Sequence, residues 1–451
     1  MGGEWRTARI EEVAERVAMG PFGSSIKVET FVPDGVPIIS GQHLHGFKVD
    51  DRVGYNFITE EHAERLKNAN VQRKDVIFTH AGNIGQVAFV PDNSKYDRYV
   101  ISQRQFYLRP NTTKVLPEYI VAFFKTPEGQ HKLLANTSQV GVPSIAQPVT
   151  YLRSLVIPLP PLPEQCAIAH ILGTLDDKIE LNRRMNQTLE EMARAIFKSW
   201  FVDFDPVRAK ATVRCEHTNW SNAQVSRAAC PNLKPEIAEL FPDEFENSEL
   251  GEIPKGWRAS QVGHHFRLTM GQSPPGSTYN EIGEGIPFYQ GRSDFGFRYP
   301  TRRVYCTVPT RFAEPGDTLV SVRAPVGDIN IAVERCAIGR GVAAIRHESG
   351  SRSFTYYTMH QLAEHFLKFE AEGSVFGCIN KADFERLPFF MPLPEVLATF
   401  DRVVSPLDDR VEIAERQTAD LAALRDTLLP KLISGKLRVK DAERFLKKRG
   451  L

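Results

Sequence analysis

Arginine side chains gather in the second half of the chain, and arginine can read nucleic-acid bases. Residues 286–346 contain nine arginines, no lysine and five acidic residues, so their net charge is +4. Arginine can donate two hydrogen bonds to guanine and can also clamp a phosphate. The candidate contacts in this stretch are Gln290, Arg292, Arg302, Arg303, Arg323 and Arg340. An ordinary solvated arginine remains an equally open interpretation for any single one of them.

A second set of candidates lies near the N-terminus, among aromatic residues. It is rich in amides and imidazoles, which suit contacts with base edges. Its members are Gln42, His43, His45, Lys48, Arg73, Lys74, Gln103, Arg104 and Gln105. We therefore expect amide-heavy readout in the first half of the chain and arginine-heavy readout in the second.

Sequence motifs of common enzymes are absent. The chain has no phosphate-binding loop of the Gly-x-x-x-x-Gly-Lys-Ser/Thr type, no His-Glu-x-x-His and no Gly-x-Ser-x-Gly. It also lacks the Asn/Asp-Pro-Pro-aromatic motif with which amino-methyltransferases hold a flipped base. His43-x-His45 and His264-His265 have no partners at metal-ligand spacing, so they favour surface or core histidines. We expect no catalysis, no metal and no cofactor in this chain.

The two candidate sets belong to two copies of one unit. Four segments recur in the same order: Trp5–Gly20 at Trp257–Gly271, Gly35–Gln42 at Gly285–Arg292, Asp75–Gly85 at Asp317–Gly327, and Val156–Pro160 at Phe390–Pro394. Their separation falls from 252 residues (257 − 5) to 234 (390 − 156), so the second copy has shorter loops. A duplicated unit of this length excludes a solenoid, whose repeats have 20–50 residues.

Each copy is predicted to hold a mixed αβ domain followed by a long helix. Short apolar runs between Gly/Pro turns indicate strands, and one helical stretch is expected at Pro117–Leu134 in the first copy and Phe354–Phe369 in the second. The predicted boundaries are 1–158 and 251–394 for the domains, 159–204 and 395–440 for the long helices, 205–250 for an extended connector, and 441–451 for a basic tail. The tail is interpreted as a solvated helix end, with contact to nucleic acid as the alternative.

Apolar residues at alternating spacings of four and three predict a coiled-coil seam in both long helices. The seam positions are Ile168, Leu172, Leu175, Ile179, Leu189 and Ile196 in the first helix, and Phe400, Val404, Leu407, Val411, Leu421 and Leu428 in the second. A pseudo-twofold molecule would set the helices antiparallel, each about 50 Å long. Two unrelated surface helices are the alternative. The polar seam positions Asn182 and Asn186 would either fix the register or face solvent.

Composition limits the class of protein. The chain has 451 residues, 42% of them hydrophobic and 25% charged, which indicates several globular domains. Its net charge is +1, so any nucleic-acid site must be a local patch. The start of the chain has no signal-peptide pattern, no apolar run is long enough to span a membrane, and the six cysteines form no CxxC pair. We expect a cytoplasmic protein with reduced thiols that makes no membrane contact.

Several longer strings resemble the specificity (S) subunit of type I restriction-modification systems over nearly the full length. They are Leu159-Pro-Pro-Leu-Pro-Glu-Gln165, Ser199-Trp-Phe-Val-Asp-Phe-Asp-Pro206, the segment Leu240–Trp257, and the domain starts Met19-Gly-Pro and Met270-Gly-Gln-Ser-Pro. One departure is Pro392-Leu-Pro-Glu395, which lacks the expected glutamine.

This resemblance implies an α+β fold in which two similar target-recognition domains are held apart by two long antiparallel helices with pseudo-twofold symmetry. Each domain would read half of a bipartite, asymmetric sequence in double-stranded DNA, and the helices would set the spacing. The subunit would dock two modification (M) subunits that methylate adenine with S-adenosylmethionine. Restriction (R) subunits would add ATP- and Mg-dependent translocation and cleavage.

Two other functions stay open at this point. One is a stand-alone nuclease or methyltransferase, which would need an active-site motif. The other is a duplicated protein-binding scaffold that never touches DNA.

Overall fold

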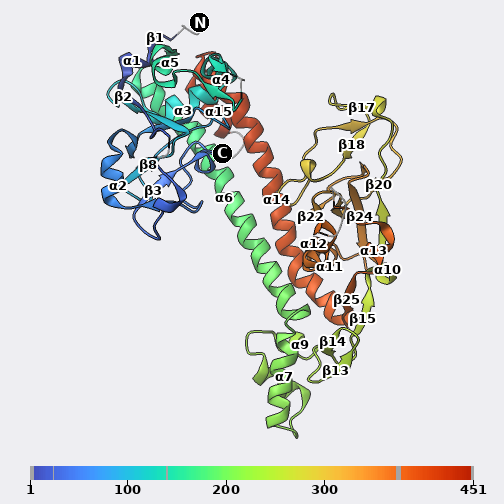
Figure 1. Ribbon diagram of the computed structural model, residues 1–451. Coiled ribbons are helices and arrows are strands. Elements are labelled where there is room, and N and C mark those ends of the chain that lie inside the picture. The colour runs from blue at the N-terminus through green and yellow to red at the C-terminus, as the bar shows by residue number, and fades with distance from the viewer. Residues whose placement is uncertain (1–4, 24, 139–140, 372–376, 448–451) are drawn as a thin grey trace. The chain divides into compact units, whose positions relative to one another are not determined.

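The computed structural model describes residues 5–23, 25–138, 141–371 and 377–447 (Figure 1). The chain divides into two compact units: residues 1–184 with 414–451, and residues 185–413. Each unit contains one mixed αβ domain and part of both long helices.

The first domain is built on two four-stranded sheets. One has the antiparallel order β2-β9-β6-β7, and the other has the order β4-β3-β8-β5, in which β3 and β8 are parallel. The strands are β2 (Ala14–Met19), β3 (Val36–Ile39), β4 (Asn56–Ile58), β5 (Asn70–Gln72), β6 (Val76–Thr79), β7 (Val87–Phe89), β8 (Arg98–Ile101) and β9 (Gln105–Pro110). Strand β6 lies between β9 and β7 and is buried along its whole length, as its β-branched and aromatic residues favour. The pair β1 (Thr7–Arg9) and β12 (Val156–Pro158) joins the start of the domain to its end.

Short helices cover this domain. They are α1 (Ile10–Val13), α2 (Glu60–Arg65), α3 (Pro117–Lys125), α4 (Pro127–Leu134) and α5 (Pro148–Ser154), with a small hairpin β10 (Thr137–Ser138) and β11 (Ser144–Ile145) after α4. The expected single helix over 117–134 is therefore two helices. Proline cannot continue a helix, and Thr126 ends α3 and caps α4 by accepting a hydrogen bond from the Gly129 amide at 2.9 Å.

The second domain repeats the strand pairing of the first and adds one strand, β17, to its second sheet. Its sheets have the orders β16-β24-β21-β22 and β17-β19-β18-β23-β20, with β18 and β23 as the parallel pair, and β15 pairs with β25 as β1 does with β12. The strands are β15 (Arg258–Gln261), β16 (Phe266–Met270), β17 (Tyr279–Asn280), β18 (Ile286–Tyr289), β19 (Tyr305–Cys306), β20 (Phe312–Ala313), β21 (Thr318–Val322), β22 (Val326–Ile331), β23 (Cys336–Ile338), β24 (Val342–His347) and β25 (Pro388–Met391). The helices are α10 (Val262–His265), α11 (Arg352–Gln361), α12 (Ala363–Ala371) and α13 (Lys381–Glu385), so the stretch expected over 354–369 is also split. The predicted duplication is present in the fold.

The two long helices are α6 (Leu162–Phe201) and α14 (Pro394–Ile433). Each has 40 residues, so each is about 60 Å long at 1.5 Å per residue. Of the twelve seam residues, Leu189, Ile196 and Leu407 are half-buried and the other nine are buried. The seam positions therefore face the interior, as a coiled coil requires.

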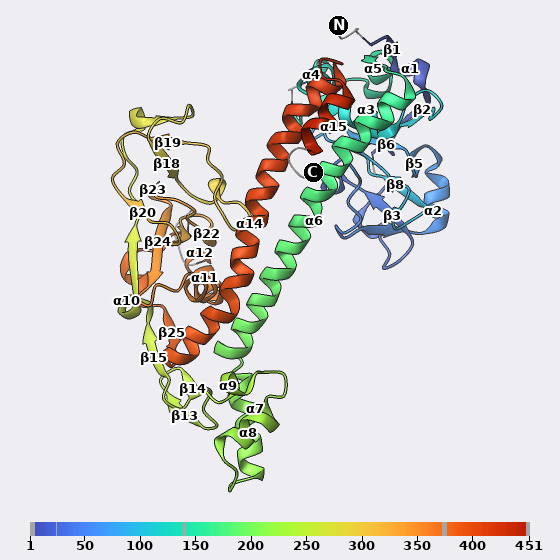
Figure 2. The same ribbon diagram turned by 180° about the vertical axis from the view of Figure 1, so that it is seen from behind.

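Within each unit the two helix segments run antiparallel (Figure 2). In the first unit Asp176 pairs with Arg425 at 3.0 Å, and Asn182 donates to the side chain of Gln417 at 3.0 Å. In the second unit the rings of Phe197 and Phe400 lie 5.7 Å apart. Asn182 and Asn186 are both buried, so they do not face solvent.

The connector is not extended as expected, but helical. It contains α7 (Asp205–Glu216), α8 (Asn222–Ala229) and α9 (Pro235–Ala238), followed by the hairpin β13 (Phe245–Ser248) and β14 (Gly251–Pro254). Buried Val207, Val225 and Phe241 give it an apolar centre. The fully buried Lys210 ammonium donates to the carbonyl of Ala238 at 3.0 Å, which ties α7 to α9.

The C-terminal segment also differs from the prediction. Helix α14 ends at Ile433, before Gly435 in the left-handed region, rather than at residue 440. A separate helix, α15 (Val439–Lys447), follows and buries Val439, Ala442 and Leu446 in the core of the first unit. One face of the predicted solvated tail is therefore packed, while residues 448–451 lie outside the described residues.

Candidate nucleic-acid interface

Four segments of the first domain meet at one edge of its sheets. They follow β2, follow β3, join β6 to β7 and join β8 to β9. Backbone hydrogen bonds connect them: Gly20 donates to the Gln105 carbonyl at 2.9 Å, and His80 donates to the Arg104 carbonyl at 2.9 Å. A Cβ at Gly20 would lie 2.3 Å from the Ser102 carbonyl oxygen, so only glycine fits there. We call residues 20–23, 40–45, 80–86 and 102–105 the first loop edge.

Four of the predicted contacts are exposed at the first loop edge: Gln42, His45, Gln103 and Arg104. Loops at the end of a rigid sheet are where binding side chains are commonly placed. Their amide, imidazole and guanidinium groups can donate hydrogen bonds to an approaching duplex.

His43 and Gln105 belong to the same edge but are both 1% exposed. The His43 ring stacks on Tyr55 with centroids 4.3 Å apart, and its Nδ1 accepts from the Ser40 amide at 3.0 Å. Burial lowers the pKa of His43, which keeps it uncharged near neutral pH. Gln105 accepts from the Ser102 hydroxyl. Both residues were predicted to contact bases, but their burial makes them internal supports of the loops.

Lys48, Arg73 and Lys74 lie away from the first loop edge. Lys48 pairs with Asp177 of α6 at 2.5 Å. Arg73 and Lys74 precede β6, at the end opposite its turn into the loop edge, and they pair with Asp97 at 2.8 Å and Asp92 at 3.8 Å. The tertiary structure therefore separates these three cations from the candidates with which they were grouped.

The second domain has an equivalent loop edge, formed by residues 271–273, 290–294, 323–326 and 339–341. Gly271 donates to the Val342 carbonyl at 2.9 Å, and Gly339 donates to the Tyr289 carbonyl at 2.8 Å. The Arg340 amide donates to the Ser273 hydroxyl at 3.2 Å. These bonds hold the turn between β23 and β24 against the segment that follows β16.

Four predicted contacts are exposed at this second loop edge: Gln290, Arg292, Arg323 and Arg340. Arg292 also pairs with Asp328 at 3.2 Å, which orients its guanidinium. Among the described residues, Arg323 and Arg340 form no ion pair within 4 Å. They are the two side chains at this edge most open to a new anionic or base partner.

Arg302 and Arg303 are exposed but already paired. Arg302 contacts Glu334 at 2.5 Å, in the segment between β22 and β23, and Arg303 contacts the buried Asp294 at 2.9 Å. Asp294 in turn accepts from the Gln290 amide at 2.7 Å. Arg303 thus helps to shape the second loop edge, and Arg302 lies beyond the far end of β22.

Sequence reasoning missed several residues that hold the loops in place. Gln86 donates to the Gly41 carbonyl at 3.0 Å, and Gln130 donates to the Gly85 carbonyl at 2.9 Å. Both side chains bridge segments far apart in the sequence, so no local pattern could have revealed them. Arg298, one of the nine clustered arginines, is fully buried against α6 and α14 in the second unit. Arg298 lies 250 residues after Lys48, so the two residues occupy equivalent positions of the repeat. This equivalence was the sequence feature that could have singled out Arg298.

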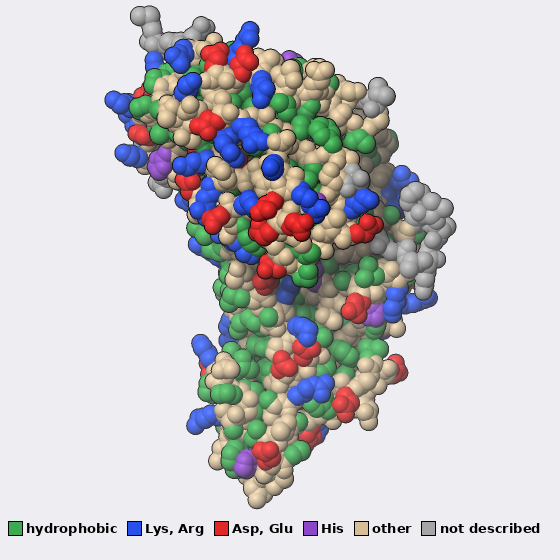
Figure 3. All heavy atoms as spheres, turned by 60° about the vertical axis from the view of Figure 1, so that its left-hand side comes forward, with side chains coloured by type: hydrophobic (Ala, Val, Ile, Leu, Met, Phe, Trp, Pro, Cys, Tyr) green, Lys and Arg blue, Asp and Glu red, His purple; other side chains and the backbone are tan. Residues whose placement is uncertain are grey.

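Charge on the surface is mixed. On the face shown in Figure 3, Lys and Arg side chains alternate with Asp and Glu and form no single basic field. In the part of the chain that the structure describes, no three His, Cys, Asp or Glu side chains are grouped to hold a metal ion. Within the same ranges, no helix is both long and apolar enough to cross a membrane.

Comparison with known proteins shows similarity to one family. Residues 2–191 match the family model of the type I restriction modification DNA specificity domain. The chain is 29% identical over 447 residues to the MjaX protein of Methanocaldococcus jannaschii, which is named as a type I restriction enzyme specificity subunit; the match covers 97% of this chain and 94% of that protein. It is 26% identical over 415 residues to the type I restriction enzyme HindI specificity subunit of Haemophilus influenzae, covering 81% of this chain and 87% of that protein.

A solved structure supports the fold. The type I restriction-modification system S subunit from M. genitalium has a TM-score of 0.55 at 14% identity, covering 95% of this chain and 96% of that one. The duplicated αβ domains, the two long helices and these matches agree. The chain is similar, over nearly its full length, to specificity subunits of type I restriction-modification systems.

Proposed function

We propose that this chain is the DNA-recognition subunit of a type I restriction-modification complex and reads a bipartite, asymmetric target. Each loop edge contacts one half-site, and α6 and α14 set the number of unread base pairs between them. The chain performs no catalysis of its own.

One observation carries this proposal: the two domains have the same strand pairing and the same loop edge but present different donors. At equivalent places in the repeat, Gln42 in the first domain corresponds to Arg292 in the second, and Ala81 corresponds to Arg323. An asymmetric target requires two domains of the same fold that present different side chains, because arginine and amide side chains favour different bases.

Chemistry belongs to the partners under this proposal. Two modification subunits dock on the chain and methylate adenine with S-adenosylmethionine, and restriction subunits use ATP and Mg. The double-stranded DNA target is the one ligand that this chain itself binds. A protein of this kind works in the cytoplasm, where the genome is accessible.

Domain exchange with methylation mapping tests the proposal. Residues 1–158 are replaced by the corresponding domain of another specificity subunit, and methylated adenines are mapped across a genome that carries the whole system. One half-site should change while the other half-site and the spacer length stay the same. A change in both half-sites would contradict the assignment of one reader to each domain.

A further inference from the structure

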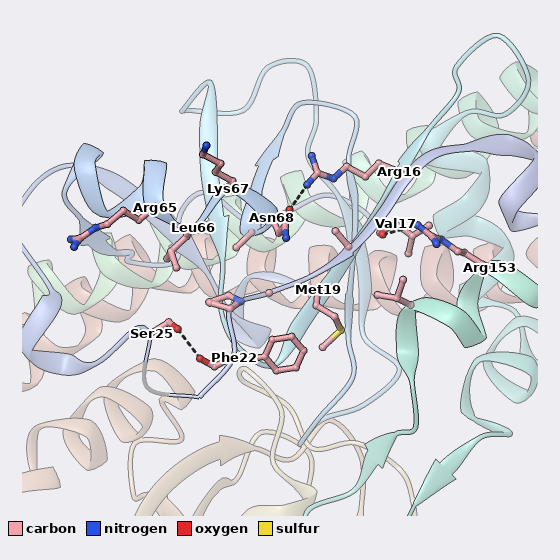
Figure 4. Close-up of a pocket in the computed structure, with 15 residues that line it drawn as sticks. Arg16, Val17, Met19, Phe22, Ser25, Arg65, Leu66, Lys67, Asn68 and Arg153 are labelled. Atoms are coloured by element: carbon pink, nitrogen blue, oxygen red, sulfur yellow. Dashed lines mark hydrogen bonds between the residues drawn. The ribbon is translucent and has the colours of Figure 1, made fainter.

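A basic hollow of about 750 Å³ lies beside strand β2 in the first domain (Figure 4). β2 is the edge strand of its sheet, so one side of its backbone is not covered by a neighbouring strand. The segment that follows α2 lies on one side of it and α5 lies on the other. The hollow was not among the sites predicted from sequence.

Four cations line this hollow: Arg16, Arg65, Lys67 and Arg153. Its described lining contains no Asp or Glu. None of the four cations forms an ion pair within 4 Å among the described residues. By contrast, Arg73, Lys74 and Arg98 of the same domain each pair with a carboxylate. The hollow therefore concentrates positive charge that the protein itself does not neutralise.

Two of the guanidinium groups are already oriented by neutral partners. Arg16 donates to the side-chain oxygen of Asn68 at 2.7 Å, and Arg153 donates to the Val17 carbonyl at 3.3 Å. Each guanidinium has five N–H donors, so most of them remain available. Arg65 and Lys67 are exposed at the same hollow and can follow a flexible anionic partner.

The hollow is continuous with the first loop edge. Strand β2 passes along the hollow and ends at Met19, and Gly20 is then bonded to the turn that presents Gln103 and Arg104. Phe22, in the loop that follows, also lines the hollow and is 76% exposed. An exposed aromatic ring beside unpaired cations suits a ligand with both anionic and apolar surfaces, such as a sugar-phosphate backbone.

We propose that this hollow binds the sugar-phosphate backbone of duplex DNA at the half-site whose bases the first loop edge reads. The inference rests on the proposed function and adds the contact that positions the duplex. Arg16, Arg65 and Lys67 neutralise phosphates, and Arg153 completes the clamp from α5. Such contacts raise affinity for every sequence and carry no base preference.

The test is the salt dependence of DNA binding by the full-length chain. Fluorescence anisotropy with a random-sequence 40-base-pair duplex is measured between 50 and 200 mM KCl for the wild type and for the triple variant Arg16→Gln, Arg65→Gln, Lys67→Gln. Each lost phosphate contact should lower the slope of log K against log salt by about 0.9. If three contacts are lost, the fold-decrease in affinity between 50 and 200 mM KCl should be about 40 times smaller in the variant than in the wild type.

A matched control removes the same charge elsewhere on the domain. The triple variant Arg73→Gln, Lys74→Gln, Arg98→Gln replaces three paired cations away from the hollow and should keep the wild-type slope. Thermal unfolding checks that both variants fold. Equal slopes in the hollow variant and the wild type would overturn the inference, as would equal decreases in both triple variants.

A separate outcome bears on the proposed function itself. If the wild type binds no duplex at any salt concentration while both triple variants fold normally, then DNA recognition by this chain is contradicted. Loss of binding to vesicles of anionic lipid in the hollow variant, with an unchanged DNA slope, would assign the hollow to a membrane surface instead and overturn the inference.

Discussion

Arg298 in the second unit and Lys48 in the first occupy the same place in the repeat, and both link an αβ domain to the long helices. Arg298 is fully buried: it contacts Glu190 of α6 at 3.2 Å and Asp408 of α14 at 2.5 Å, and donates to the Tyr357 hydroxyl at 2.7 Å. Lys48 forms one ion pair among the described residues, with Asp177, and the two side chains are 40% and 61% exposed. One repeat position thus carries a buried network in one unit and a surface ion pair in the other.

The difference teaches how each domain is attached. A buried charge is tolerated only when its partners are complete, because removal of one partner leaves the others unpaired in a medium of low dielectric constant. An exposed pair contributes little, since water and salt screen it. Apolar packing joins domain and helices in both units. The polar link is buried and strong in the second unit, whereas the polar links of the first unit, such as Arg52 with Glu180, are partly exposed and weak.

The largest expected effect comes from Arg298. Replacement by Met should destabilise the second unit by about 3–5 kcal/mol, because Glu190 and Asp408 would remain buried without a counter-charge. Urea unfolding of the full chain, followed by Trp fluorescence, measures the loss. The combined variant Arg298→Met, Glu190→Leu, Asp408→Leu should recover most of it. Failure of this rescue would show that packing of the arginine, and not its charge, makes the contribution.

A pH effect of about 2 kcal/mol is expected from His347, also in the second unit. Burial lowers the pKa of His347 from 6.5 to about 4, so the folded state disfavours its protonated form. The free energy of unfolding therefore has its full value above pH 6.5, where His347 is neutral in both states, and decreases as the pH falls toward 4. At pH 5 the decrease is about 2 kcal/mol. Urea unfolding at pH 7 and pH 5 should show this loss, and His347→Gln should reduce it. An unchanged pH dependence in that variant would exclude His347 as its source.

If the two loop edges contact different half-sites, substitution of a single arginine at either edge should change sequence specificity by about 10- to 100-fold. Arg340→Ala should relax discrimination at one position of the second half-site by about 1–3 kcal/mol, the range for a bidentate contact with guanine. Arg104→Ala should act on the first half-site alone. Binding of single-base variants of the mapped target measures both. Equal weakening for all sequences would show that the arginine contacts a phosphate instead.

The smallest effect is expected from the surface counterpart of Arg298. Lys48→Met should change the free energy of unfolding by at most about 1 kcal/mol, and by less at high salt. The same urea experiment at 50 and 500 mM KCl measures it. A loss comparable to that of Arg298→Met would mean that the two attachments are equivalent, contrary to the comparison.

Much of the architecture followed from local pattern. Val76–Thr79 and Thr318–Val322 are β-branched runs between turn residues, and both are fully buried interior strands. The alternating apolar residues of α6 and α14 gave the seam because helical periodicity depends only on neighbours in sequence. The connector was misjudged because its short helices are stabilised by tertiary contacts, such as those of Lys210, rather than by a long periodic pattern.

The candidate interface was only partly predictable. Gln42 and Gln105 have the same side chain, yet the first is exposed and the second is 1% exposed. The cations of the hollow beside β2 come from β2, from the segment around α2, and from α5, so their grouping exists only after folding. No spacing rule in the sequence brings residues 16, 65 and 153 together.

The sequence by itself determined that the chain is a duplicated αβ unit with two long helices, because repeats and periodicity are properties of order along the chain. Tertiary structure decided what each polar residue does. Arg298 and Arg340 are the same residue type 42 positions apart (340 − 298), but one is enclosed by carboxylates and tyrosines and the other projects from a turn. The role of a charged side chain depends on which groups surround it, and only the folded chain brings those groups together.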